Sequence, residues 1–414
     1  MRLSPARPLL VACGVLILTN GPVFLVANRV LEQPRSWEEA FTRAVFVSLA
    51  LVAVGAVVLD RFRAEGARLA SPNPVAALAI VWFVVWMVAS SAWSLNPELT
   101  RGRSLVYVGL AAFAWIISDL EFTDFRRALA VATGAAVGAS LVAVALSDSI
   151  GADFNGDWRG IYTNRNSLAP IAAVAVLVGV SLVIESRGIR RVAAGLLVVF
   201  AALALAGSGS RTAWLALLVA MGAAFVLVGA RVGGRRYGAR VRSAVLVAGF
   251  AGAAAAMAVL SWLWGEPTFE QRRTIWDLVR DRIAERPLQG FGWFNVWTDA
   301  EFVSEHYLLT RGSAHGSFFE VWLGLGLVGL IPFLVIVGLA LHGTITEAWR
   351  RPSVESWTWL ALVLFLVVEN LTESFVLWFS YNWVLLMAAA LRSGVGRRST
   401  IEPRTLVPSE PVSV

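Results

Sequence analysis

Lysine is absent from this sequence, cysteine occurs once, and charge of either sign is scarce. All 35 basic residues are arginine, and 15% of the residues are charged while 57% are hydrophobic. A typical soluble domain has about 25% charged and about 45–50% apolar residues, so this composition excludes an ordinary soluble fold and indicates a membrane protein. The single cysteine, Cys13, excludes an intrachain disulfide and a cysteine-based metal site. We expect it to be a small buried apolar residue.

Long apolar segments recur along the chain. Most approach the roughly 20 residues that span a hydrocarbon core of about 30 Å. Within the first ten, acidic or basic side chains occur only at or near the start of a segment, at Arg191, His315 and Glu320, and the eleventh carries Glu369 and Glu373 near its end. The sequence therefore predicts an all-α polytopic membrane protein with about 12 transmembrane helices. The segments lie at about 8–28, 44–59, 75–93, 104–118, 128–147, 167–184, 191–207, 212–230, 243–264, 315–341, 357–375 and 376–391.

Arginines gather in the loops on one side of the predicted membrane. If the segments alternate, these loops contain residues 2–7, 61–68, 126–127, 187–191, 231–242 and 350–351. Since basic residues favour the cytoplasmic side, we expect both termini in the cytoplasm and the protein in the cytoplasmic membrane. Residues 1–392 then form the transmembrane domain, 266–313 form one large extracytoplasmic loop inserted in it, and 393–414 form a disordered cytoplasmic tail.

A second set of arginines falls on the opposite, extracytoplasmic side, against the positive-inside bias. Solvation, or pairing with a nearby acidic residue such as Asp157, explains any one of them. Several arginines beside the same helix ends also match a site for a phosphate or diphosphate, because the forked guanidinium binds such anions bidentately. The members of this set are Arg101, Arg103, Arg159, Arg165, Arg211, Arg272 and Arg273.

Four parts of the chain, in order, resemble the O-antigen ligase and O-antigen polymerase superfamily of polytopic membrane glycosyltransferases. They are ASSAWSLNPELTRGRSL (89–105), DWRGIYTNRNSLAP (157–170), GSGSRTAWLALL (207–218), and RRTIWDLVRDRIAERPLQGFGWFNVW (272–297) followed by AHGSFFEVWLGLGLVGL (314–330). Each motif is weak alone, whereas their order, spacing and common outer position make the resemblance specific. The sequence departs from the family pattern at Gly316, where asparagine usually follows the histidine. This departure leaves the type of acceptor open.

The resemblance implies an enzyme that moves a glycan from a polyprenyl-diphosphate carrier to a glycan, lipid or protein acceptor at the outer face of the membrane. His315 is expected to be the general base, because an imidazole exchanges protons near neutral pH. The diphosphate is assigned by the same resemblance to Arg165, Asn166, Arg211 and Arg273, with Arg159 and Arg272 as secondary candidates.

This mechanism is expected to need no metal ion, no other cofactor and no nucleic acid. Arginines can neutralise the leaving diphosphate in place of a divalent cation. The outer loops contain no Asp-x-Asp motif or acidic cluster that would hold such a cation. The remaining partners are the membrane lipids around the predicted helices.

The large loop is predicted to contain an amphipathic helix. Apolar residues recur at helical spacing from Ile275 to Ile283, opposite Asp277, Arg280 and Asp281. Such a helix is expected to lie on the outer membrane surface. The aromatic residues expected to anchor it in the headgroup layer are Trp276, Trp293, Phe294 and Trp297.

Three alternatives remain open from the sequence. His315 taken alone, without the motif, is also consistent with a residue that caps a helix end or bonds a backbone carbonyl. The outer arginines also suit a transporter or flippase of a lipid-linked glycan, although ionisable groups are nearly absent from the segment centres, where ion-coupled transporters usually have them. Gly316 allows an inactive scaffold of an envelope-glycan assembly complex. The motifs do not separate ligation from polymerisation, and they identify neither the glycan nor the oligomeric state.

Overall fold

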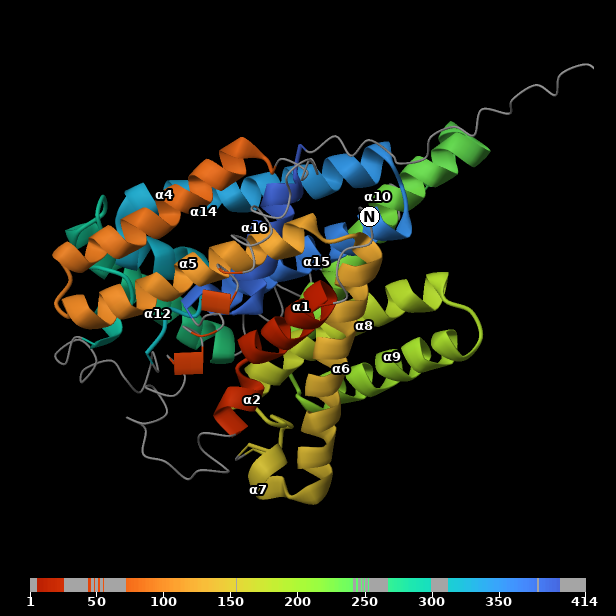
Figure 1. Cartoon of the computed structure of the whole chain (residues 1–414), viewed down its shortest axis with the longest axis horizontal. Helices are drawn as coiled ribbons and strands as arrows, with labels where there is room; N and C mark the ends of the chain where they lie inside the picture. The colour runs from red at the N-terminus through yellow and green to blue at the C-terminus, as the bar shows by residue number, and fades with distance from the viewer. Residues whose placement is uncertain are drawn as a thin grey trace, which may run out of the picture.

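The fold is helical throughout the part of the chain that the structure describes. The computed structural model describes residues 6–25, 72–153, 155–240, 267–298, 312–377 and 380–394, with a few isolated residues in 44–55 and 243–252. Within these ranges every regular element is a helix and none is a strand (Figure 1). The prediction of an all-α protein is therefore confirmed.

The described helices follow the predicted apolar segments. The α-helices are α1 (Ala6–Leu18), α2 (Gly21–Phe24), α4 (Pro74–Ala89), α5 (Pro97–Asp119), α6 (Phe122–Leu146), α7 (Asp148–Gly151), α8 (Arg165–Glu185), α9 (Ile189–Gly207), α10 (Arg211–Tyr237), α12 (Pro267–Glu285), α14 (Ser317–Arg350), α15 (Val354–Thr372) and α16 (Tyr381–Arg392). Every predicted segment except 44–59 and 243–264, which lie almost wholly outside the described residues, overlaps with at least one of them.

Seven described helices are long and apolar enough to cross a membrane, namely α4, α6, α8, α9, α10, α14 and α15. This fits a polytopic membrane protein. The total of about 12 spans remains a prediction, because it also counts helices outside these seven, such as α1, α5 and α16, and segments outside the described residues. The large loop and the cytoplasmic tail likewise fall partly or almost wholly outside them.

Polar residues ahead of the apolar runs fix where several helices begin. Asn73, Asn96 and Asn164 each accept a hydrogen bond from a backbone N–H in the first turn of α4, α5 and α8. Such a cap stabilises a helix by about 1 kcal/mol. Because Asn164 caps α8, the next two residues, Arg165 and Asn166, lie in its first turn and stay at the mouth of the helix.

The helices pack into neighbouring groups rather than one parallel bundle (Figure 1). α8 and α9 form a hairpin beside α6, while α4 lies along α14. α8 is mostly buried, whereas α9 turns a row of apolar side chains outward, including Leu196, Val199 and Phe200. An outward apolar row on a long helix is what contact with lipid requires, so α9 lies at the edge of the protein.

The long helix α14 is broken at Gly326, where φ is 64°. The backbone groups released by the break bond to the turn at residues 287–292. Phe291 N–H donates to the Leu323 carbonyl at 3.0 Å, and further backbone bonds join the turn to α14 on both sides of the break. The Pro-x-x-Gly-x-Gly motif therefore fills a gap in a helix, which keeps polar backbone groups satisfied in an apolar surrounding.

Replacing Gly326 by alanine is expected to destabilise the protein by about 1–3 kcal/mol or more. A Cβ there would lie 2.1 Å from the Leu288 carbonyl oxygen and would demand a left-handed backbone. Thermal unfolding in detergent should show a lowered midpoint for this variant. Gly338→Ala in the same helix is the matched control, because its Cβ would meet nothing within 4 Å. Equal midpoints for the two variants would contradict the account of the break.

Helix α12 is amphipathic, as predicted, but its apolar face contacts protein and not the membrane surface. Its apolar residues, including Ile275 and Val279, are buried, and the helix packs against α14. Trp293 and Trp297 are also buried rather than set in a headgroup layer. The expectation that the apolar face lies on the membrane surface is therefore wrong, because the protein itself covers that face.

The expectation for Cys13 is also wrong, since the side chain is exposed. α1 turns apolar residues such as Val11 and Val15 toward the core. Cys13 lies on the face of the helix that points away from them. A small apolar residue on a membrane helix can face lipid as readily as protein.

Candidate active site

The motifs identified in the sequence meet in pairs in three dimensions. The first pair joins the segment at 89–105 to the end of the motif at 272–297. Trp293 N–H donates to Ser90 Oγ at 3.0 Å, and Asn96 N–H donates to Asn295 Oδ1 at 3.2 Å. These bonds are buried or partly buried, so they fix the start of α5 against the turn that follows α12.

The second pair joins the segments at 157–170 and 207–218. Trp158 N–H donates to the Gly207 carbonyl at 2.8 Å. A Cβ at Gly209 would lie 2.6 Å from Asp157 Oδ1, so only glycine lets the turn come this close. Burial in the same segment raises the pKa of the Tyr162 phenol, which therefore stays a neutral hydroxyl.

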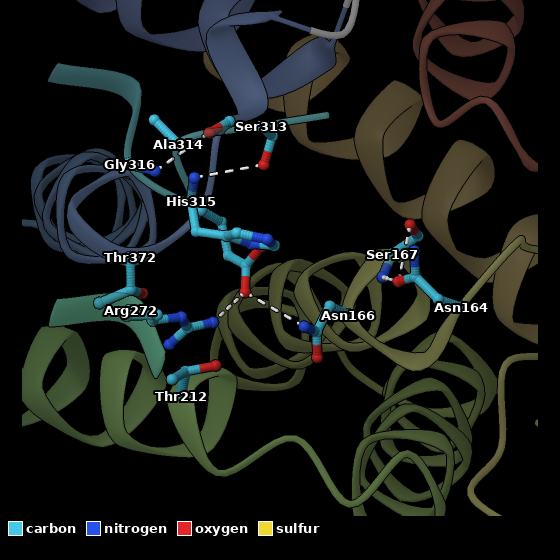
Figure 2. Close-up of polar contacts among 12 residues, drawn as sticks. Asn164, Asn166, Ser167, Thr212, Arg272, Ser313, Ala314, His315, Gly316 and Thr372 are labelled. Atoms are coloured by element: carbon cyan, nitrogen blue, oxygen red, sulfur yellow. Dashed lines mark hydrogen bonds and ion pairs between the residues drawn. The ribbon is translucent and has the colours of Figure 1, made fainter. Parts of the chain in front are cut away.

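Three of the predicted site residues converge on one carboxylate, that of Glu373. Arg272 Nη2 donates to Glu373 Oε1 at 2.6 Å, and Asn166 Nδ2 donates to the same oxygen at 3.2 Å. His315 Nδ1 lies 4.0 Å from Glu373 Oε2. Figure 2 shows the side chains of Asn166, Arg272 and His315 pointing toward one another from three different segments of the chain. We call this set the Glu373 cluster.

The Glu373 cluster is largely withdrawn from solvent. The side chains of Arg272 and Glu373 are 7% and 12% exposed, and that of His315 is 27% exposed. Glu369, one helical turn earlier, interacts electrostatically with Arg272 and Glu373. Interactions between charges are stronger at such a site than in water, while His315 keeps an open side on which an acceptor could approach.

A second buried carboxylate holds the loop that carries His315. Glu320 Oε1 accepts from Ala314 N–H at 2.5 Å and from the Ser374 hydroxyl at 2.9 Å, and Glu320 Oε2 accepts from Trp297 Nε1 at 2.8 Å. His315 itself has a φ of 48°, a left-handed conformation that is uncommon for a residue other than glycine. The surrounding hydrogen bonds therefore impose this backbone conformation on His315.

Gly316, which stands where the family usually has asparagine, lies in tightly packed surroundings. Gly316 N–H donates to Ser374 Oγ at 3.0 Å. A Cβ at this position would lie 3.3 Å from the Leu371 carbonyl oxygen and 3.6 Å from Trp276 Nε1. The first contact is tight, so an asparagine here would require a small adjustment of its neighbours.

The remaining predicted residues lie at different places around these segments. Arg165 forms an ion pair with Asp157, as pairing with an acidic neighbour would predict. Arg159 Nη2 donates to the Ser149 carbonyl at 2.7 Å. Arg211 begins α10 and is exposed, immediately before Thr212, which Figure 2 places below Arg272.

The two neighbouring arginines of α12 have different surroundings. Arg272 is buried within the Glu373 cluster, whereas Arg273 is exposed. Consecutive residues of a helix point about 100° apart, so α12 can bring only one of them to Glu373. The sequence favoured Arg273 as a ligand of the diphosphate and gave Arg272 only as a secondary candidate. In the structure it is Arg272 that lies in the Glu373 cluster.

Glu373 and Glu320 are the residues that sequence reasoning did not assign to the site. Glu373 was visible as one of two acidic residues in an otherwise apolar segment, a pattern that often marks function in a membrane protein. Glu320 lies six residues after Ala314 and carries no such signal apart from its charge near the start of an apolar run. Among the described residues, no group of three His, Cys, Asp or Glu side chains is placed to hold a metal ion.

Comparison with known families matches residues 196–334 to the family model described as O-antigen ligase. This part of the chain is similar to the O-antigen ligases. The resemblance found in the motifs is therefore confirmed for this part of the chain, and the long apolar helices fit a membrane protein. No curated protein matches the chain.

The matched residues 196–334 contain part of the Glu373 cluster but not all of it. Arg211, Arg272, Arg273 and His315 lie within the matched residues 196–334. Asn166 and Glu373 lie outside this range and contact its residues from α8 and from the end of α15. The cluster therefore depends on helices on both sides of the matched sequence.

Proposed function

We propose that this chain transfers a glycan from a polyprenyl-diphosphate carrier to a hydroxyl or amine of an acceptor. The observation that supports this proposal is the convergence of Asn166, Arg272 and His315 on one partly buried carboxylate. Groups that bind an anion and a group that accepts a proton thus lie within one small site. The O-antigen ligase domain supports the same class of reaction.

His315 acts as the general base in the proposed reaction. Its imidazole accepts the proton of the acceptor hydroxyl while the acceptor oxygen forms a bond to the anomeric carbon of the donor. The bond between that carbon and the diphosphate oxygen breaks, and the electron pair leaves with the lipid diphosphate. The partial exposure of His315 gives the acceptor a path to the imidazole.

The cationic and amide groups bind the diphosphate and stabilise the charge that grows on it. Asn166 and Arg272 hold the phosphate nearest His315. The exposed residues Arg211 and Arg273 reach the diphosphate from the open side, and Arg165 supports it from the first turn of α8. Arg159 is a more distant candidate, since its guanidinium already donates to a backbone carbonyl.

The proposed membrane arrangement follows the sequence. The protein is a multi-pass protein of the cytoplasmic membrane with both termini in the cytoplasm. The Glu373 cluster and the loop at 266–313 face outward, which gives access to a donor that has already been flipped. No metal ion takes part, because the arginines supply the positive charge.

A flippase or transporter is the second candidate, and the break in α14 is the observation that favours it. Transporters often place their substrate sites at broken helices. Here the turn at 287–292 occupies the break and bonds to its backbone groups. Those groups are therefore not available to coordinate an ion or a substrate, which favours the transferase.

A deletion strain separates the two candidates. Loss of a transferase should cause lipid-linked glycan to accumulate on the outer leaflet, whereas loss of a flippase should leave it on the inner leaflet. The purified chain in liposomes should then move the glycan from its lipid diphosphate to the acceptor, and EDTA should not inhibit this transfer. Accumulation of the lipid-linked glycan on the inner leaflet would refute the transferase. If EDTA inhibited the transfer and added magnesium restored it, the proposal that the reaction needs no metal would be wrong.

A further inference from the structure

We propose that Glu373 is a positioning residue with two alternative partners. In the site without donor, its carboxylate holds Arg272 and Asn166 in place of a phosphate of the donor. When the diphosphate takes over these two residues, Glu373 moves to His315 and orients it as the base. This inference rests on the proposed function and adds a way in which the donor completes its own active site.

The contacts of Glu373 are those that a phosphate oxygen would make. A guanidinium and a side-chain amide both donate to Oε1, at 2.6 Å and 3.2 Å. Guanidinium groups bind carboxylates and phosphates with the same fork of N–H donors. Asn166 and Arg272 come from α8 and α12, and a single anionic oxygen placed between them binds both.

The charges of the cluster allow Arg272 to bind either the Glu373 carboxylate or the diphosphate of the donor, but not both at once. While Glu373 is bound, its negative charge neutralises Arg272 and repels a second anion at the same place. A diphosphate carries more charge than one carboxylate, so it can displace Glu373 from a largely buried arginine. Arg272 therefore contributes to donor binding only after Glu373 has moved.

The pair of His315 and Glu373 is not yet hydrogen-bonded. The distance of 4.0 Å between Nδ1 and Oε2 is too long for a hydrogen bond, and a shift of about 1 Å would close it. When this gap has closed, His315 Nδ1–H donates a hydrogen bond to the Glu373 carboxylate. The other ring nitrogen, Nε2, then faces the acceptor and accepts its proton. The carboxylate then also stabilises the imidazolium that forms when His315 takes the proton.

The loop of His315 is fixed, so the movement has to come from Glu373. Ala314 N–H is bound by Glu320, His315 N–H by Ser313 Oγ, and Gly316 N–H by Ser374 Oγ. Glu373 lies just beyond the last residue of α15 in an extended conformation. Its side chain has three rotatable bonds and can move from one partner to the other without rearrangement of a helix.

The decisive experiment compares the wild type with Glu373→Gln, using polyprenyl diphosphate without glycan as the binding probe. The variant keeps the shape of the side chain but no longer neutralises Arg272, so the Kd for polyprenyl diphosphate should fall roughly three- to ten-fold. At the same time kcat for glycan transfer should fall at least about ten-fold, because the imidazolium has lost its partner. A residue that only supported the fold would weaken both binding and turnover.

The pH profile gives a second measurement. In the described structure the charged groups near His315 are Glu320 from α14 and Glu373 at the end of α15, and Glu373 in turn faces Arg272 from α12 and Glu369 from α15. Loss of the Glu373 charge makes the imidazolium less stable in the donor complex. The acid limb of the kcat profile should therefore move to lower pH in Glu373→Gln.

Glu355→Gln is the matched control, because Glu355 is at the other end of α15 and pairs with Arg392 away from the cluster. Glu373→Asp is the second variant, to be used if Glu373→Gln does not fold. It keeps the negative charge, but its side chain is shorter and reaches Arg272 and His315 less well. It should also bind polyprenyl diphosphate more tightly and turn over more slowly. Weaker binding, or a kcat equal to that of Glu355→Gln, would overturn the proposal. Absence of any transfer by the wild type would instead refute the proposed function itself.

Discussion

Replacing His315 by alanine is expected to lower the rate of glycan transfer by about 10²- to 10⁴-fold, the range that general base catalysis contributes. The protein should still fold, because the loop is held by Glu320 and Ser374 through backbone groups rather than through the imidazole. A transfer assay in liposomes measures the rate, and a complementation test in the deletion strain measures its consequence in the cell.

His342→Ala is the matched control for this experiment. His342 lies on the same helix, α14, far along the chain from His315, and is exposed. The control should restore the envelope glycan fully, while His315→Ala should leave the lipid-linked donor unused. Full restoration by His315→Ala would show that the histidine only ends a loop. That result would support the alternative hypothesis of an inactive scaffold, which needs no catalytic base.

The second large effect is expected for Arg272→Ala. Removing one partner of a buried ion pair leaves the other charge uncompensated and destabilises a protein by about 3–5 kcal/mol. Both side chains of this pair are largely buried, at 7% and 12% exposure. The unfolding midpoint in detergent should therefore drop well below that of Arg280→Ala, which changes an exposed arginine on the same helix.

A double variant separates the stability effect from the catalytic one. Arg272→Ala combined with Glu373→Gln no longer contains an uncompensated carboxylate, so it should recover a large part of the lost stability. It should not recover transfer, because the proposed diphosphate ligand is still missing and such groups are worth about 10²–10³ in rate. If the double variant regained activity together with stability, Arg272 would have only a structural role.

The positions of the helices could largely be predicted from the sequence. Apolar runs of membrane-spanning length are local features, and so are the asparagines that cap α4, α5 and α8. The amphipathic period of α12 was also visible. The sequence did not reveal what covers its apolar face, because protein and lipid are equally apolar partners for residues such as Ile275 and Val279.

The candidate site could be predicted only in part. The motifs selected His315 and Asn166, which the structure brings to one place. The choice between Arg272 and Arg273 depends on how α12 is rotated against α14, and no local pattern fixes that rotation. Glu373 was visible only as an acidic residue in an apolar segment, because the contact to Arg272 joins residues that are 101 positions apart.

What the sequence determined by itself is the class of molecule: a helical membrane protein whose motif arginines and histidine resemble those of the O-antigen ligases. Hydrophobic length, charge bias and short motifs are local properties and can be read along the chain. Only the tertiary structure decided that Glu373 joins Asn166, Arg272 and His315, and that the turn at 287–292 fills the break in α14. Both results depend on helices meeting across long stretches of sequence, and packing rather than composition decides which side chains then touch.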